Sequence, residues 1–191
     1  MKMKKEELKL KILSDYKLEK DKELGDFYVK ETENSVNVVV LDNLSIDCAI
    51  PLIDNRELIK GVRMYLNEDQ GIVEAVNTKT KNNEICAYTI LKQAMQPSGM
   101  MYILTLQILR DNYLINVHGE FIEHGMIGMR DATIFGALGG KLNEWAFDPY
   151  DKRVKKGMLM NKSELKEFDD KFPNHPLSEA RKFVEYVLEN N

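Results

Sequence analysis

Cysteine is scarce in this sequence, which has only Cys48 and Cys86 among its 191 residues. The two lie far apart, each beside apolar residues, and neither belongs to a CxxC pair. A secreted domain held together by disulfides carries more cysteines in a shorter chain. The sequence therefore argues against a disulfide scaffold, and we expect two free, buried thiols.

Long apolar runs are also lacking. The most apolar stretch, 100–109, is interrupted by Thr105 and Gln107, and no stretch approaches the roughly 18 apolar residues of a membrane span. The first residues, 1–7, are charged and are not followed by the apolar run of a signal peptide. These observations predict a cytoplasmic protein without a membrane partner.

A surplus of positive charge is the third thing that the sequence lacks. Lys and Arg number 27 against 31 Asp and Glu, which gives a formal net charge of -4. A domain that binds nucleic acid usually carries a basic footprint. We therefore expect no nucleic-acid partner, with one local exception discussed below.

What the sequence contains is typical of a globular protein. Its hydrophobic fraction of 43% and charged fraction of 30% are ordinary values. The length suits one domain of roughly 100–200 residues. No repeat, linker or low-complexity segment divides the chain, so residues 1–191 are predicted to form a single domain.

The middle of the chain predicts an antiparallel sheet. Apolar side chains alternate along four stretches joined by short polar turns: 72–78, 85–91, 101–109 and 113–121. Short connections make neighbouring strands antiparallel, because parallel strands need a long crossover. An earlier pair of β-rich stretches, 27–29 and 36–41, predicts a hairpin or a pair of adjacent strands, and 46–50 predicts one more short strand. The fold class is therefore α+β, with an antiparallel β-meander packed by helices.

Helical patterns surround this sheet. They predict an N-terminal helix over about 3–18, helices over 54–66 and 126–138, and a C-terminal helical segment over about 161–190. Asn161 and Glu164 have the spacing of a capping box, and Pro176 suits the first position of the last helix. In the meander, Tyr102, Leu104 and Ile108 fit either a face covered by a helix or a homo-oligomer interface, and both alternatives remain open.

Two groups of polar residues near 118–131 are candidate binding sites. His118 and Glu120 share a face of a strand, and with His124 they are candidate metal ligands. Glycines near Arg130 lie at the junction between a strand and the N-terminus of a helix. Backbone N–H groups at a helix N-terminus attract anions, and the Arg130 guanidinium could add a further contact. The alternatives are exposed polar residues on the solvent side of the sheet end, and a tight turn with a capped helix in which Arg130 pairs with Asp131 or Glu123.

A third candidate is the aromatic loop within 141–162, which carries Trp145, Phe147 and Tyr150. Aromatic residues and arginine are common at protein-binding hot spots. Basic residues at 152–156 follow directly, which would suit single-stranded nucleic acid, although the acidic neighbours argue against it. The alternative is a loop pinned to the core by its own aromatics.

Sequence motifs for catalysis are missing. There is no GxSxG and no Cys with a nearby His. No cofactor motif is present, so we expect no cofactor and favour a non-enzymatic, protein-binding role through Trp145, Phe147, Tyr150 and Arg130. The alternative is a metal- or anion-dependent enzyme, or a ligand-binding protein, with its site at the end of the sheet.

Two resemblances add to this interpretation. The order of elements over roughly 25–140 resembles the Mog1/PsbP-like α+β sandwich. The segments 148–151, 157–164 and 172–178 resemble the C-terminal region of small bacterial proteins, some of which lie beside toxin or secretion genes. This second resemblance implies a bacterial immunity-type or secretion-associated protein, and it brings no catalytic residues with it.

Overall fold

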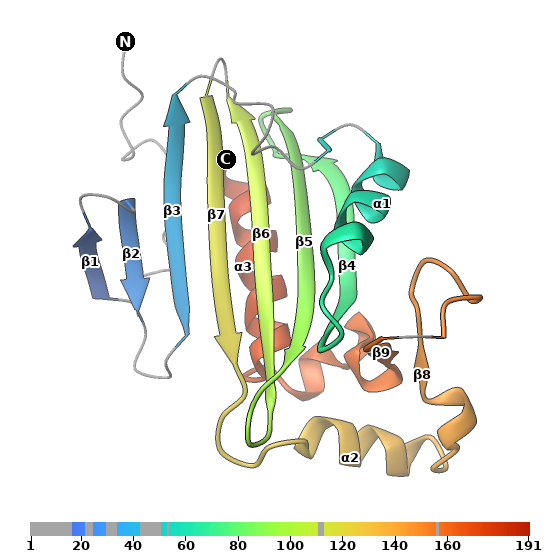
Figure 1. Cartoon of the computed structure of the whole chain (residues 1–191). Coiled ribbons are helices and arrows are strands. Elements are labelled where there is room, and N and C mark those ends of the chain that lie inside the picture. Colours follow the sequence, from blue (N-terminus) through green and yellow to red (C-terminus); the bar gives the residue numbers. More distant parts are fainter. Residues whose placement is uncertain are drawn as a thin grey trace.

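The computed structural model describes residues 17–21, 25–29, 34–42, 51–52, 54–110, 113–155 and 157–191. Their main feature is a seven-stranded antiparallel sheet with the order β1-β2-β3-β7-β6-β5-β4 (Figure 1). The strands are β1 (Lys17–Asp21), β2 (Gly25–Val29), β3 (Ser35–Asp42), β4 (Gln70–Lys79), β5 (Ile85–Ala94), β6 (Met100–Arg110) and β7 (Tyr113–Ile122). With its helices, this sheet confirms the predicted α+β class.

The four strands from β4 to β7 form the predicted meander. Each pairs with the next in antiparallel register, so that Ala87 faces Gln107 across β5 and β6, and Leu106 faces Val117 across β6 and β7. β2 and β3 form the predicted hairpin. β3 then joins β7, which extends the meander into one continuous sheet.

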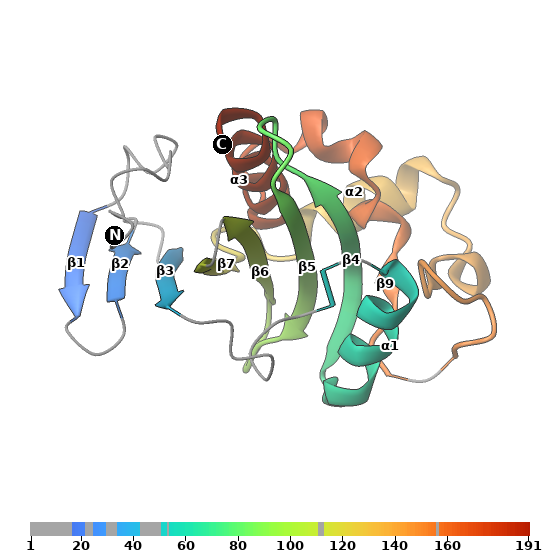
Figure 2. The ribbon, with the colours of Figure 1, turned by 90° about the horizontal axis from the view of Figure 1, so that it is seen from above.

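One face of the sheet is covered by α3 (Pro176–Asn190), as Figure 2 shows. The main core lies beneath this helix, where Leu177, Phe183 and Val187 pack against strand residues that include Leu104 and Val117. The buried residues Tyr102, Leu104 and Ile108 belong to the same cluster. Of the two alternatives for these three residues, the structure therefore shows a face covered by a helix, α3.

The opposite face carries α1 (Asn55–Tyr65) near the β4 edge (Figure 2). Asp54 caps this helix by accepting a hydrogen bond from the Arg56 amide, 2.7 Å away. The fully buried Leu58 packs on Ile72 and Ala87 in a second, smaller core. This helix confirms the one predicted over 54–66.

The β4 edge also fits closely against the chain that leads to β9. A Cβ atom added to Gly71 would lie 2.1 Å from the carbonyl oxygen of Met158. Contacts that short do not occur between ordinary side chains and backbone, so this position needs glycine. Just beyond it, a β-bulge between Ile72 and Glu74 shifts the register of β4 against β5.

The remaining helices lie after the sheet. They are α2 (Met129–Ala137), η4 (Leu142–Glu144), η5 (Lys162–Glu164) and η6 (Lys166–Lys171), and a small ribbon of β8 (Ala146–Phe147) and β9 (Met160–Asn161) lies among them. The predicted capping box is confirmed, because both of its hydrogen bonds are present, including Asn161 N–H to Glu164 Oε2 at 2.6 Å. The helical segment predicted over 161–190 is confirmed as η5, η6 and α3.

The N-terminal prediction is corrected in part. Residues 3–16 of the predicted helix lie outside the described residues, as does the strand predicted over 46–50. Lys17 and Leu18, however, begin β1, where they pair with Val29 and Tyr28. The helix therefore does not reach residue 18, because sheet pairing outweighs the weak helical periodicity there. Within the described part of the chain, none of the helices has the length and apolar character to cross a bilayer.

Candidate functional site

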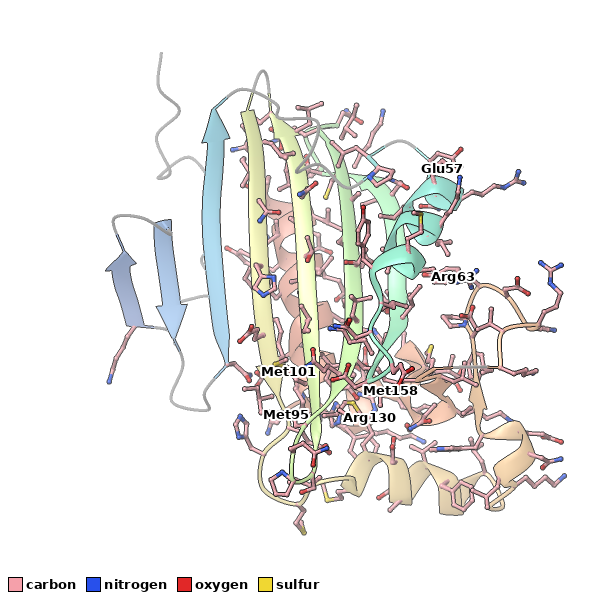
Figure 3. The ribbon with its side chains drawn as sticks, in the orientation of Figure 1. Glu57, Arg63, Met95, Met101, Arg130 and Met158 are labelled. Atoms are coloured by element: carbon pink, nitrogen blue, oxygen red, sulfur yellow. The ribbon has the colours of Figure 1, made fainter. Side chains whose placement is uncertain are left out.

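A buried network of charged side chains holds α2 to the end of the sheet. Arg130, in the first turn of α2, is 1% exposed. Its guanidinium donates to the carbonyl oxygen of Ser163 at 2.7 Å, to Ser178 Oγ at 2.9 Å and to Asp169 Oδ1 at 2.9 Å. Figure 3 shows Arg130 at this end of the sheet. The helix is thus fastened to η5, η6 and α3 by one side chain.

Asp169 links Arg130 to a second buried arginine. Arg181 of α3 donates to both carboxylate oxygens of Asp169, at 2.9 and 3.2 Å, and to the carbonyl oxygen of Glu164 at 2.7 Å. It also pairs with Glu74 on β4. One carboxylate therefore lies between two guanidinium groups, and the cluster ties α3 to the sheet.

The third part of the network is the ion pair of Lys92 and Glu164. Their side chains are 1% and 2% exposed, and Nζ lies 2.8 Å from Oε2. Tyr102 donates its hydroxyl to Glu164 Oε1 at 3.0 Å. Burial and the Glu164 carboxylate raise the pKa of Tyr102 well above its usual value, so it stays a protonated donor. Glu164 is therefore held by the sheet as well as by its own cap.

These contacts give the network a structural role. Within the described residues, the buried side-chain atoms without a hydrogen-bond partner are Arg63 Nε and Asn77 Oδ1, and neither belongs to it. Fully paired buried charges hold a particular arrangement of elements. Arg130 was predicted to bind an anion or a partner. The structure shows its guanidinium engaged by protein groups, as in the alternative interpretation, although with Asp169 as its carboxylate.

The three candidate metal ligands lie in two places. His118 and Glu120 are neighbours on the face of β7 away from α3, with His118 Nε2 3.5 Å from Glu120 Oε1 and both side chains 44% exposed. His124 follows the end of β7 and lines a cleft described below. Among the described residues, no group of three His, Cys, Asp or Glu side chains is placed to hold a metal ion.

The aromatic residues of the predicted loop contact the body of the protein, with Tyr150 38% exposed. Trp145 is half-buried and meets Phe135 of α2 edge-on, with ring centroids 5.1 Å apart. Phe147 packs against the main core. The Tyr150 hydroxyl accepts from the Ala75 amide at 2.7 Å. These contacts give all three an anchoring role, and their predicted role as direct binding residues stays a prediction.

Tyr150 also borders a hollow of about 430 Å³ on the surface of α1. The hollow is lined by Arg56, Lys60 and Arg63 as well as by Asp151. In Figure 3, Arg63 extends from α1, and its guanidinium donates to Asp148 at 2.6 Å. Asp151 pairs with Arg153 in the same loop. Acidic partners thus accompany the basic residues here, in keeping with the argument against nucleic acid.

The segment that contains α2 carries a group of exposed apolar side chains. Five of the eight large hydrophobic side chains that are exposed in the described structure lie within residues 126–142. They are Met126, Ile127, Met129, Leu138 and Leu142. The other exposed positions between them are Ala132, Thr133, Gly136, Ala137, Gly139, Gly140 and Lys141, of which only Lys141 is charged. We call residues 126–142 the α2 surface; the side chains that anchor it point inward.

The two charged residues inside α2 do not interrupt this surface. Arg130 is buried, and Asp131 is half-buried and accepts hydrogen bonds from Ser163 and from Asn161, the latter at 2.8 Å. Ile134 is also buried. In Figure 1, α2 runs across the end of the sheet. The helix is therefore fixed along its inner side while its outer side presents apolar atoms to solvent.

A cleft of about 530 Å³ opens beside the α2 surface. Its lining includes Ile122, Met126, Met129, Phe172 and Pro173, with polar groups from Glu123, His124 and His175. Further polar or charged lining residues are Asn34, Arg130, Lys171, Asn174 and Glu179. The volume is in the range of ligand sites in proteins. The cleft lies between the end of β7, the start of α2 and the segment that enters α3.

Besides the buried Asn34 and Arg130, two nearly buried polar residues line the cleft, Glu123 and His175. The Glu123 side chain is 9% exposed, and its Oε1 accepts a hydrogen bond from the Gly128 amide at 2.7 Å. Burial raises the pKa of the carboxyl above its usual value, although the Gly128 amide opposes the shift. Desolvation thus costs stability at this position.

His175 is the other, and it caps α3. Its Nδ1 accepts a hydrogen bond from the Leu177 amide at 3.2 Å, and its ring meets Tyr102 edge-on at 5.6 Å between centroids. Burial, followed by the nearby Arg130 charge, lowers the pKa of His175 to about 3. The imidazole is therefore neutral at pH 7. Because Nδ1 accepts, its proton is on Nε2.

Sequence reasoning found only part of this site. His175 precedes Pro176, the predicted first residue of the last helix, and it caps that helix, but nothing near it in the sequence points to Glu123. The two are brought together by the pairing of β7 with β6 and by the packing of α3, which are long-range contacts. A signal was present in the glycines of 125–128, since Gly128 adopts a positive φ and directs its amide to Glu123.

Comparison with known proteins adds no family assignment. No protein-family model matches the chain, and no curated protein matches its sequence.

Proposed function

We propose that this protein is a non-catalytic binding protein that engages a protein partner through the α2 surface. The observation that carries the proposal is the clustering of exposed Met126, Ile127, Met129, Leu138 and Leu142 within one short segment, in which the exposed charged residue is Lys141. Contiguous apolar patches on a soluble protein commonly mark interaction sites. Methionine side chains suit such a role because they adapt to the partner.

The way α2 is held supports the same proposal. Arg130 and Asp131 fasten its first turn, and Phe135 rests on Trp145 farther along. A binding helix that is already fixed loses little conformational entropy when a partner arrives, and this preorganisation favours affinity. Arg130 and Trp145 then serve binding as positioning residues.

The class of partner follows from the resemblances given above. The likeness of segments 148–151, 157–164 and 172–178 to bacterial proteins near toxin or secretion genes supports an immunity-type or secretion-associated role in the bacterial cytoplasm. The Mog1/PsbP-like likeness belongs to the same proposal. An apolar binding surface suits an immunity protein, which acts by covering another protein rather than by chemistry.

The test uses a photo-reactive amino acid placed at Met126 in cells of the source organism, with Met64 as the matched control. Their side chains are equally exposed, at 74% and 72%, but Met64 lies on α1. We expect a cross-linked protein at position 126 and none at 64. The captured protein, once purified, should bind at least tenfold more weakly to M126D than to M64D.

Two results would overturn the proposal. One is an equal loss of affinity in M126D and M64D, which would place the contact elsewhere. The other is the absence of any cross-link at position 126 above the level at 64. A cross-link between two copies of the chain would identify the partner as the protein itself, and the oligomer mass should then fall in M126D.

A further inference from the structure

We infer that the cleft between β7, α2 and η6 binds a small uncharged molecule with an apolar body and one amide or hydroxyl group. This inference does not depend on the proposed protein partner. It uses Glu123 and His175, which lie at the inner part of the cleft rather than on the outward side of α2. Three observations carry it, namely a polar gap, its apolar surroundings and the charge around it.

The polar gap is the distance of 3.9 Å between His175 Nε2 and Glu123 Oε1. That distance is too long for a hydrogen bond. His175 is neutral, so the pair is not a salt bridge, although the two groups face each other. One side of the gap therefore offers an N–H donor and the other a carboxylate acceptor.

A ligand group that bridges these two must accept one hydrogen bond and donate another. Amides and hydroxyls do both, whereas a carboxylate only accepts and an ammonium only donates. The Leu177 amide holds the imidazole by Nδ1, and the Gly128 amide holds the carboxylate. Both groups are thus oriented before a ligand arrives, which lowers the cost of binding.

Apolar residues form part of the cleft wall beside the gap. Ile122, Met126, Met129, Phe172, Pro173 and Pro176 contribute to the lining. A volume of about 530 Å³ lies in the range of small-molecule sites. The ligand body should therefore be aliphatic or aromatic, and its polar group should enter first.

The charge around the gap selects against anions. Glu123 and Glu179 both line the cleft. The cationic residues of the lining are Arg130, which is engaged by Asp169, and Lys171, which is exposed and has its Nζ 5.5 Å from the centroid of the Phe168 ring. A carboxylate ligand would meet the Glu123 charge in a partly desolvated place. A cationic ligand would pair with Glu123 but would face the His175 N–H at the other side of the gap. A neutral ligand satisfies both groups.

The experiment follows the methionine methyl signals of the full chain by NMR while four probes of similar shape are added. The probes are benzamide, toluene, benzoate and benzylamine. We expect benzamide to shift the methyl signals of Met126 and Met129 but not that of Met64, with a dissociation constant of about 1–10 mM for so small a probe. Toluene and benzylamine should bind at least tenfold more weakly, and benzoate should not bind.

Two variants test the polar pair directly. H175N keeps a helix cap for the Leu177 amide but removes the Nε2–H donor. E123Q keeps the oxygen that accepts from the Gly128 amide and faces His175, but it removes the carboxylate charge and replaces the other oxygen by an N–H donor. Each should weaken benzamide binding at least tenfold while leaving the weak toluene binding unchanged, and the methyl spectrum itself reports whether each variant is folded.

The inference fails if toluene binds as tightly as benzamide, because the polar gap would then play no part. It also fails if benzoate binds, if folded H175N and E123Q both bind benzamide like the parent protein, or if benzamide leaves the Met126 and Met129 signals unmoved. A protein partner found at the α2 surface would neither support nor weaken it, so the two proposals can fail separately.

Discussion

Replacing Glu164 by glutamine should destabilise the protein severely. Glutamine has nearly the same shape and can still cap the Asn161 amide, since capping boxes accept either residue. What it removes is the negative charge 2.8 Å from the Lys92 ammonium, which is 1% exposed. Removing one partner of a buried ion pair costs about 3–5 kcal/mol, because the other charge stays buried without compensation.

The size of the effect can be converted into a change in melting temperature. For a chain of 150–250 residues, 1 kcal/mol corresponds to about 2–4 °C. E164Q should therefore melt roughly 6–20 °C below the parent protein. Urea unfolding monitored by circular dichroism would give the free energy directly, provided that the slope with urea is unchanged.

A second variant separates the charge from the shape. In K92M/E164Q the ammonium is gone together with the carboxylate, and a thioether of similar length fills its space. We expect the double variant to recover at least half of the free energy of unfolding that E164Q loses. The reasoning is refuted if E164Q costs less than about 1 kcal/mol, or if the two substitutions simply add.

Three further predictions concern other positions. Below pH 6.5 the unfolded chain protonates His175, whereas the folded chain, in which the pKa of His175 is about 3, does not. The free energy of unfolding should therefore fall by up to about 4 kcal/mol between pH 6.5 and 3. Urea titrations of H175N at several pH values should lack this part of the pH dependence, and an equal pH dependence in H175N would contradict the assignment. G71A should lower the free energy of unfolding by about 2 kcal/mol or more, because its methyl group would meet the Met158 carbonyl. An unchanged free energy of unfolding in urea titration would show that the chain at Met158 can move away from the β4 edge. W145A should cost about 1–3 kcal/mol through its contact with Phe135, measured by thermal unfolding, and an unchanged melting temperature would remove Trp145 as an anchor of α2.

The sheet was predictable because its signals are local. Alternating apolar residues over 72–121 with short polar turns allow little except an antiparallel meander, and the structure has it. The caps were predictable for the same reason, since Asn161 with Glu164 and the His175-Pro176 step are read within a few residues. Such features need no knowledge of the tertiary structure.

The buried network and the cleft were not predictable in this way. Lys92 near the end of β5 looks like an ordinary solvent-facing lysine, and its partner Glu164 comes 72 residues later. Arg181 and Glu74 are separated by 107 residues. Charged residues are usually exposed, so only the packing of α3 across the sheet reveals which of them are buried together. The α2 surface was hidden for the opposite reason, because its apolar residues resemble those of a core helix.

The position of α3 in the chain also affects how the protein is made. The strands β4 to β7 are complete once Ile122 has been synthesised, but the helix that covers them begins at Pro176, about 50 residues later. At typical rates of about 5–20 residues per second, the ribosome needs about 3–10 s for that distance. During this time α3 does not cover the strand face that carries Leu104 and Val117. The nascent chain therefore exposes an apolar, aggregation-prone surface. Chaperone demand during translation should therefore depend on how soon α3 emerges.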